Sequence, residues 1–185
     1  MATAGDEAQV PSRSLVIKDA WRRADPALEA DALVFWTRQE LLPAQVSARE
    51  RLDDLCSVAY RAGEVVAVAT ATLRYWPVLH ARLAMFRCAI APDHRQGAAV
   101  SQLAEASRLR LLAWARENPQ EKIKGMGAVT TTPGLDGMKR TPVWRYRGLR
   151  LVLVGFTDRG DPFRVAWFPG VKVEKPGQGF GPSGD

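Results

Sequence analysis

Alternating positions predict two neighbouring strands in the first half of the chain. Over residues 64–76 two rows alternate as on a β-strand, with Val65, Ala67, Ala69, Ala71 and Leu73 in one row and Val66, Val68, Thr70, Thr72 and Arg74 in the other. Residues 85–90 repeat the alternation, and Pro92 ends this strand because it has no N–H to donate. The two faces of the second strand are Phe86, Cys88 and Ile90 on one side and Met85, Arg87 and Ala89 on the other.

A helical period predicts three helices. The first covers residues 27–42, after the cap Asp25 and a first-turn Pro26, and Pro43 ends it. A capping box at 47–50 (SARE) opens a short second helix that reaches residue 55. The third helix begins after Gly97 and has an apolar stripe formed by Val100, Leu103, Ser107, Leu111 and Trp114.

The rest of the chain predicts further strands around one core. Strands are expected at 14–18, 57–60, 123–131, 149–156 and 163–168, a loop at 75–82, and a weak helix at 138–147 with Pro142 inside it. Small and polar residues predict a flexible leader at 1–13, and Gly, Pro, Lys and Ser predict a flexible tail at 169–185. The fold class is therefore α/β, with a single domain over residues 14–168.

The turn between the second strand and the long helix is suited to an anion. A helix N-terminus leaves about four N–H groups without intrahelical partners and has a partial positive charge. The small residues Gly97, Ala98 and Ala99 allow a diphosphate to approach those groups, and Arg95 adds a full charge. The order of strand, proline, basic turn and helix thus predicts a phosphate site.

The charge of the chain indicates a binding partner with several negative charges. The net charge is +6 with a pI near 9.7, and residues 74–150 contain 14 Lys and Arg against 5 Asp and Glu, a balance of +9. A coenzyme with several phosphates and a nucleic acid both fit such a surface.

No run approaches the roughly 20 apolar residues of a membrane span, and the N-terminus is not a secretory signal. Two buried thiols, Cys56 and Cys88, predict a reducing, cytoplasmic location, and no metal site is expected.

The segment IAPDHRQGAA, residues 90–99, resembles the central motif of the GNAT superfamily of acyl-CoA N-acyltransferases. The two glycine positions of that motif fall on Ala98 and Val100 if counted from Arg95, or on Gly97 and Ala99 if counted from His94. We prefer the second alignment because it departs less from the motif. The element order over residues 14–168 is similar to the family's topology, which implies a central mixed, mostly antiparallel sheet flanked by helices.

The resemblance implies a site for acetyl-CoA or another acyl-CoA. Backbone groups of Cys88, Ala89 and Ile90 would contact the pantetheine arm, and a second set would hold the pyrophosphate: Arg95, Gln96, Gly97, Ala98, Ala99 and Val100. The family's general acid is often a Tyr near the closing strand, and Tyr146 is the candidate here. The central strand offers no carboxylate as a base, and a bound water could serve in its place.

The resemblance implies transfer of an acyl group, with acetyl preferred, to a small-molecule or protein amine that the sequence does not identify. A catalytically silent member of the fold, which binds CoA or a protein partner, is the leading alternative. A nucleic-acid module is a lesser alternative, because residues 139–147 interleave basic side chains with Trp144 and Tyr146. A homodimer stays open, and no membrane partner is expected.

Overall fold

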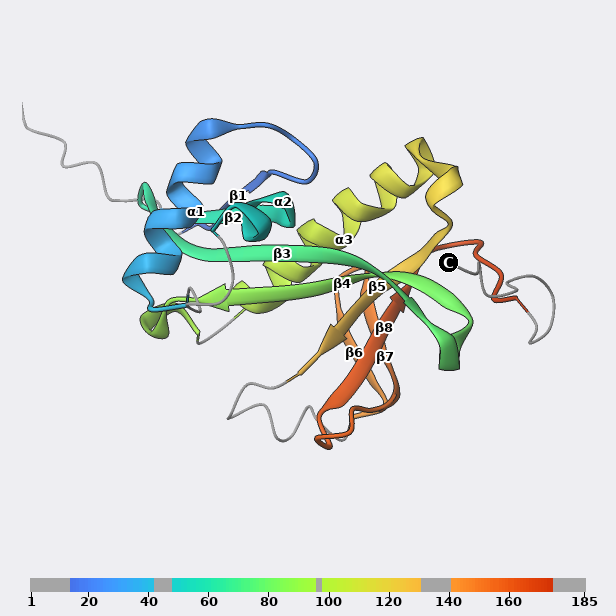
Figure 1. Ribbon diagram of the computed structural model, residues 1–185. Coiled ribbons are helices and arrows are strands. Elements are labelled where there is room, and N and C mark those ends of the chain that lie inside the picture. The colour runs from blue at the N-terminus through green and yellow to red at the C-terminus, as the bar shows by residue number, and fades with distance from the viewer. Residues whose placement is uncertain (1–13, 42–47, 96–97, 131–140, 175–185) are drawn as a thin grey trace, which may run out of the picture.

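A computed structural model describes residues 14–41, 48–95, 98–130 and 141–174 (Figure 1). Eight strands form a single sheet in the order β1-β2-β3-β4-β5-β8-β7-β6. All neighbouring pairs are antiparallel except β4 and β5, which are parallel. The expected mixed, mostly antiparallel sheet is confirmed. The elements are β1 Val16–Asp19, α1 Pro26–Arg38, α2 Ala48–Asp53, β2 Leu55–Arg61, β3 Glu64–Trp76, β4 Ala81–Ile90, α3 Ala99–Glu117, β5 Ile123–Val129, β6 Val143–Tyr146, β7 Leu149–Phe156 and β8 Pro162–Trp167.

Helices cover both faces of the sheet. On one face α3 packs Leu103 and Leu111 onto a row of small residues in β3, which includes Ala67 and Ala69. On the other face α1 buries Phe35 and Trp36 in a second cluster that includes Val58 and Val68. The two rows predicted for residues 64–76 are therefore separated by the sheet, one row under each helix layer.

The first helix ends earlier than the sequence predicts. It stops at Arg38 rather than at residue 42, because Glu40 adopts a left-handed backbone (φ 54°). The Leu41 N–H bonds to the Trp36 carbonyl at 2.9 Å and the Glu40 N–H to the Thr37 carbonyl at 3.1 Å, the two bonds of a Schellman motif. The second helix likewise ends at Asp53, and Leu55 begins β2.

The weak helix expected over 138–147 is a wrong prediction for the residues that the structure describes. Residues 143–146 form the edge strand β6, paired with β7 from Val143↔Val152 to Tyr146↔Leu149. Pro142 cannot lie inside a helix without the loss of a hydrogen bond, and the Val, Trp and Tyr that follow it favour a strand. Arg147 (φ 49°) and Gly148 form the two-residue turn of this hairpin.

The other strand predictions are confirmed with small shifts of their ends. Residues 64–76 and 149–156 form β3 and β7 with the predicted bounds, whereas part of the loop expected at 75–82 belongs to β3 and β4. The expected leader, residues 1–13, and residues 175–185 of the expected tail lie outside the described residues. No helix in the described part of the chain is long and apolar enough to cross a membrane.

Candidate functional site

The sheet opens between β4 and β5. β4 stays paired with β3 along its whole length, to Ala67↔Ile90, but its pairing with β5 ends at Phe86↔Ala128. In Figure 1 the arrowheads of β4 and β5 accordingly point apart. Residues 87–90 therefore have strand partners on one side only, and a gap separates them from β5.

Two residues of β4 direct their backbone groups into this gap. The Ala91 N–H bonds to the Val66 carbonyl of β3 at 2.9 Å. Because antiparallel pairs alternate between bonded and non-bonded positions, Cys88 and Ile90 direct their N–H and C=O groups away from β3. Among the described residues no strand lies there to receive them. This exposed edge is where the resemblance places the contacts of a pantetheine arm.

The turn after β4 brings a cation and a helix N-terminus to the same end of the strand. Arg95 donates from Nε to the Ile90 carbonyl at 3.1 Å. The helix α3 begins at Ala99, and its first intrahelical bond runs from Gln102 N–H to the Ala98 carbonyl at 2.8 Å. The N–H groups before Gln102 consequently have no intrahelical acceptor, and Ala98 has no side chain to cap them.

The structure brings together most of the predicted binding residues. Ala98 is exposed at the helix start, Ala99 is buried beneath it, and Val100 lines the opening with Cys88 and Ala89. Gln96 and Gly97 lie outside the described residues. Nearby, an Nη of Arg61 lies 3.1 Å from His94 Nδ1 and links the turn to β2.

A cleft of about 720 Å³ occupies the gap and extends to both faces of the sheet. The wall on the α3 side is mainly apolar and is lined by Phe86, Cys88, Val100, Ala104, Trp144 and Leu151, with Ala128 to Thr130 of β5 beside them. An elongated apolar chain with a phosphorylated end would fit this half, since the open N-terminus of α3 lies at its end.

The opposite half of the cleft is polar and charged. Thr70 and Thr72 of β3 lie on the same face as Arg87 of β4, because Thr70 pairs with Arg87 and Thr72 with Met85. Three further groups line this half. Trp36 of α1, Leu41 just after that helix and Arg51 of α2 form the first, the far end of β3 contributes Arg74 and Trp76, and the β7–β8 turn contributes Thr157, Asp158, Arg159 and Asp161. The cleft is thus divided by β4 into an apolar half and a polar half.

Arg51 is held in a fixed place on this polar wall. Its guanidinium carbon lies 4.9 Å from the ring centroid of Trp36, and its Nη1 donates to the backbone carbonyl of Leu41. Burial lowers the pKa of Arg51, and the positive charge of Arg87 lowers it further. The two arginines are therefore close enough for their charges to interact.

The cysteine prediction is half right. Cys56 is buried, and desolvation raises the pKa of its thiol to about 12. Cys88 is exposed instead, because β5 no longer covers β4 at that point. The concave walls around it still desolvate the thiol and raise its pKa to about 11, so Cys88 is a neutral thiol on the floor of the cleft.

Tyr146 is not brought together with the other candidates. It lies on β6 and lines a second hollow with Ser14, Gln102, Glu105 and Arg147, while Trp144 of the same strand lines the cleft. Trp144 and Tyr146 are two positions apart and therefore lie on the same face of β6. They line different hollows because Tyr146 is at the hairpin end of the strand. The geometry therefore gives Tyr146 no place beside Cys88 and Ile90.

Sequence reasoning missed the polar wall. The sequence could have indicated Thr70 and Thr72, because the even-numbered row of β3 changes from valine to polar residues at Thr70, where the sheet meets the cleft. It could not have indicated Arg51, Asp158 or Asp161, because only the tertiary fold brings them to Arg87 or to the cleft. In the described residues, no group of three or more His, Cys, Asp or Glu side chains is placed to hold a metal ion.

Comparisons with known proteins agree on the fold. No protein-family model matches the chain, and no curated protein matches its sequence. A GNAT superfamily phosphinothricin acetyltransferase from Sinorhizobium meliloti, solved in complex with AcCoA, is similar with a TM-score of 0.53 and 18% identity, over 91% of this chain and 96% of that one. A GNAT family acetyltransferase from Streptococcus pneumoniae is similar with a TM-score of 0.50 and 11% identity, over 84% of this chain and 100% of that one. Together with the opened β4–β5 edge, these similarities establish that the chain has the GNAT fold, at the low sequence identity of 11% and 18% to these two proteins.

Proposed function

We propose that the protein is an acyl-CoA-dependent N-acyltransferase, with acetyl-CoA as the preferred donor. The observation that carries the proposal is the end of β4–β5 pairing at Phe86, which leaves the backbone groups of Cys88 and Ile90 facing a cleft at the N-terminus of α3. An AcCoA complex of the similar acetyltransferase from Sinorhizobium meliloti supports the choice of donor.

The binding residues have separate tasks. The N–H and C=O groups of Cys88 and the N–H group of Ile90 would bond to the amides of the pantetheine arm, and one N–H can donate to the thioester oxygen, while the Ile90 carbonyl accepts the bond from Arg95. The N–H groups before Gln102 and the charge of Arg95 would hold the diphosphate, with Ala98 and Ala99 small enough for close approach. Gln96, Gly97 and Val100 complete the turn in the sequence motif.

The donor supplies an activated acyl group as a thioester. The amine nitrogen forms a bond to the acyl carbon while the carbon–sulfur bond breaks. The sulfur leaves with its electron pair and takes up a proton, and the nitrogen gives up a proton to a base. Asp161 is the candidate base, because its half-buried carboxylate lines the polar half of the cleft on the β7–β8 turn. Tyr146 has no role in this proposal.

A catalytically silent acyl-CoA-binding domain is the second candidate. It is favoured by the position of Tyr146 outside the cleft and by the lack of a carboxylate on β4. Turnover of acetyl-CoA with an amine would exclude it, measured as release of the free CoA thiol.

Calorimetric titration of the full chain tests the shared binding step. Acetyl-CoA and acetyl-pantetheine are compared, since the second lacks the diphosphate and the nucleotide. We expect saturable binding of acetyl-CoA that weakens as salt increases, and binding of acetyl-pantetheine that is at least tenfold weaker. No binding of acetyl-CoA, or equal binding of the two compounds, would overturn the proposal.

A further inference from the structure

Two arginines from different elements converge on the polar wall of the cleft. Arg51 comes from α2 and Arg87 from β4, and both line the half of the cleft opposite to α3. The positive charge of Arg87 contributes to the lowered pKa of Arg51, so the pair repel each other across the surface they share. Such repulsion has to be offset by the fold or by a bound anion.

Neither arginine has an acidic partner among the described residues. Elsewhere in the fold Arg82 of β4 and both Arg108 and Arg110 of α3 lie within 2.9 Å of a carboxylate oxygen. Arg51 and Arg87 form no such ion pair in the described chain, although Asp158 and Asp161 line the same cleft. The cationic wall and the acidic turn are therefore separate patches of one cleft.

Arg51 is arranged in advance of binding. The ring of Trp36 lies under its guanidinium, and the bond to the Leu41 carbonyl uses only one of its nitrogens. A guanidinium held flat in this way keeps other N–H groups to meet the two oxygens of a carboxylate or phosphate. Thr70, opposite Arg87 on β3, adds a hydroxyl to the same wall.

We propose that the acceptor is a small zwitterion, an amine that also has a carboxylate or a phosphate, and that Arg51 and Arg87 bind its anionic group. Its ammonium faces the acidic turn of Asp158 and Asp161. The proposal rests on the proposed acyl transfer and names the class of its acceptor. The phosphates of the donor are an unsuitable partner for this wall, because Arg87 lies on the face of β4 opposite to Cys88 and α3.

The first test compares acceptors that differ only in the anionic group. The twenty proteinogenic amino acids are assayed against their α-carboxamides, and O-phosphoethanolamine against ethanolamine, with acetyl-CoA as donor and CoA thiol release as readout. We expect kcat/KM at least tenfold higher for the anionic member of a pair, and the two series distinguish carboxylate from phosphate. Equal or better turnover of the neutral members overturns the proposal.

Two variants and a control assign the effect to this wall. Arg87→Gln and Arg51→Gln should lower kcat/KM for the anionic acceptor at least tenfold, mainly through KM, and leave the neutral member and the acetyl-CoA Kd within twofold. Arg116→Gln, exposed near the C-terminal end of α3, is the matched control and should change nothing. A loss that is equal for both members, or weaker acetyl-CoA binding in Arg87→Gln, overturns the proposal.

A binding measurement separates this proposal from the proposed function. O-phosphoethanolamine and L-glutamate are titrated into the wild type and into Arg87→Gln without donor, and acetyl-CoA is titrated separately. If the wild type binds a zwitterion, Arg87→Gln does not, and acetyl-CoA does not bind, then the anion site is supported and acyl transfer is rejected. If the protein binds acetyl-CoA but neither binds nor acetylates the two zwitterions, the anion site is rejected and the proposed function is not.

Discussion

Arg95 Nε lies 3.1 Å from the carbonyl oxygen of Ile90, and this bond joins the basic turn to the last residue of β4. Ile90 has no partner on the β5 side, so its carbonyl would otherwise face the cleft unpaired. The bond uses the Nε–H of Arg95, and among the described residues its Nη groups have no other partner. Arg95 can therefore stabilise the strand end and still present charge to a phosphate.

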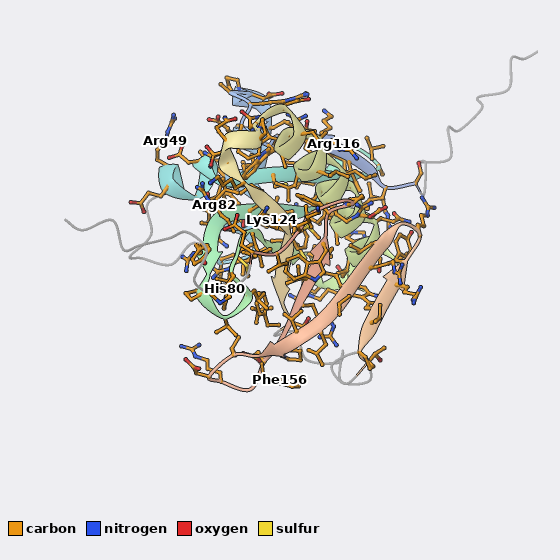
Figure 2. All side chains as sticks on the ribbon, turned by 90° about the vertical axis from the view of Figure 1, so that its right-hand side faces the viewer. Arg49, His80, Arg82, Arg116, Lys124 and Phe156 are labelled. Carbon is orange, nitrogen blue, oxygen red and sulfur yellow. The ribbon has the colours of Figure 1, made fainter. Side chains whose placement is uncertain are left out.

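The first prediction concerns this charge. Arg95→Glu removes the bond to Ile90 and places a carboxylate beside the expected diphosphate, so the Kd for acetyl-CoA should rise at least tenfold, or about 1.4 kcal/mol. Arg116→Glu makes the same change of charge at the opposite end of α3, where the side chain is exposed (Figure 2), and should shift the Kd less than twofold. Calorimetric titration measures both, and equal effects in the two variants would reject the phosphate role of Arg95.

The second prediction concerns the candidate base. Asp161→Asn keeps the size of the side chain and the backbone bonds of the turn, such as Asp161 N–H to Thr157 Oγ1 at 3.2 Å, but cannot accept a proton at neutral pH. We expect kcat to fall by 10²- to 10⁴-fold with an unchanged acetyl-CoA Kd. Tyr146→Phe should leave kcat within twofold, because Tyr146 lines the second hollow. A large loss of kcat in Tyr146→Phe and none in Asp161→Asn would assign the proton transfer to Tyr146 instead of Asp161.

The third prediction concerns Cys88. Desolvation by the walls of the cleft raises the pKa of its thiol to about 11, so the native protein holds a neutral thiol at pH 7 and forms the reactive thiolate only as the pH rises toward 11. Alkylation by iodoacetamide should speed up about tenfold per pH unit between pH 7 and 10 and slow when acetyl-CoA is present. Mass spectrometry of the modified peptide assigns the rate to Cys88 rather than to the buried Cys56. A rate that is flat with pH would contradict the raised pKa.

The fourth prediction concerns Gly148, which lies against a nearly buried ion pair. Glu105 and Arg108 pair at 2.6 Å with side chains only 13% and 10% exposed. A methyl group on residue 148 would lie 2.7 Å from Glu105 Oε1 and 3.3 Å from Arg108 Nη2. Gly148→Ala therefore has to displace the pair, and we expect a loss of about 1–3 kcal/mol in the free energy of unfolding, measured with urea.

A double-mutant cycle gives the control for Gly148. Glu105→Ala removes the atom that the new methyl group would meet, so adding Gly148→Ala to it should cost less than in the wild type. Equal costs in the two backgrounds would mean that the close approach does not decide the effect.

The fifth prediction concerns a buried hydrogen bond between helix and sheet. The hydroxyls of Ser57 on β2 and Ser107 on α3 are 3.1 Å apart, and both residues are buried. Ser107→Ala should lower the free energy of unfolding by about 1 kcal/mol, because Ser57 loses the hydroxyl of Ser107 and keeps only the long bond from its Oγ to Cys56 Sγ at 3.9 Å. The double variant Ser57→Ala/Ser107→Ala should lose less than the sum of the single losses, and strict additivity would exclude a coupled pair.

The sequence predicted the regular part of the fold because local periodicity is strong there. The two rows of residues 64–76 and the run 149–156 correspond to β3 and β7 with their bounds, and the stripe with Leu103 and Leu111 corresponds to the buried side of α3. The predictions that were wrong lie where short-range signals compete. The end of α1 depends on a left-handed residue, Glu40, and residues 143–146 become a strand because β7 is available for pairing.

The turn for which a phosphate site is predicted could be identified from the sequence because its residues are contiguous. Pro92, Arg95, Ala98 and Ala99 are close in the chain, and a helix N-terminus offers its N–H groups wherever it begins. The polar wall was not accessible in the same way. Arg51 and Arg87 are 36 positions apart, and neither the alternation of β4 nor the capping box before α2 indicates that their charges meet.

By itself, then, the sequence determined the strand and helix pattern of the core and the sequence of proline, basic residues and helix start after β4, for which a phosphate site is predicted. Both depend on neighbours within about one or two turns of chain. The tertiary structure alone decided where β4 parts from β5, that Cys88 is exposed in a cleft, that Tyr146 lines a different hollow, and that Arg51 and Arg87 line the same cleft. These features depend on long-range packing and pairing, in which each residue's surroundings are set by segments distant in the chain.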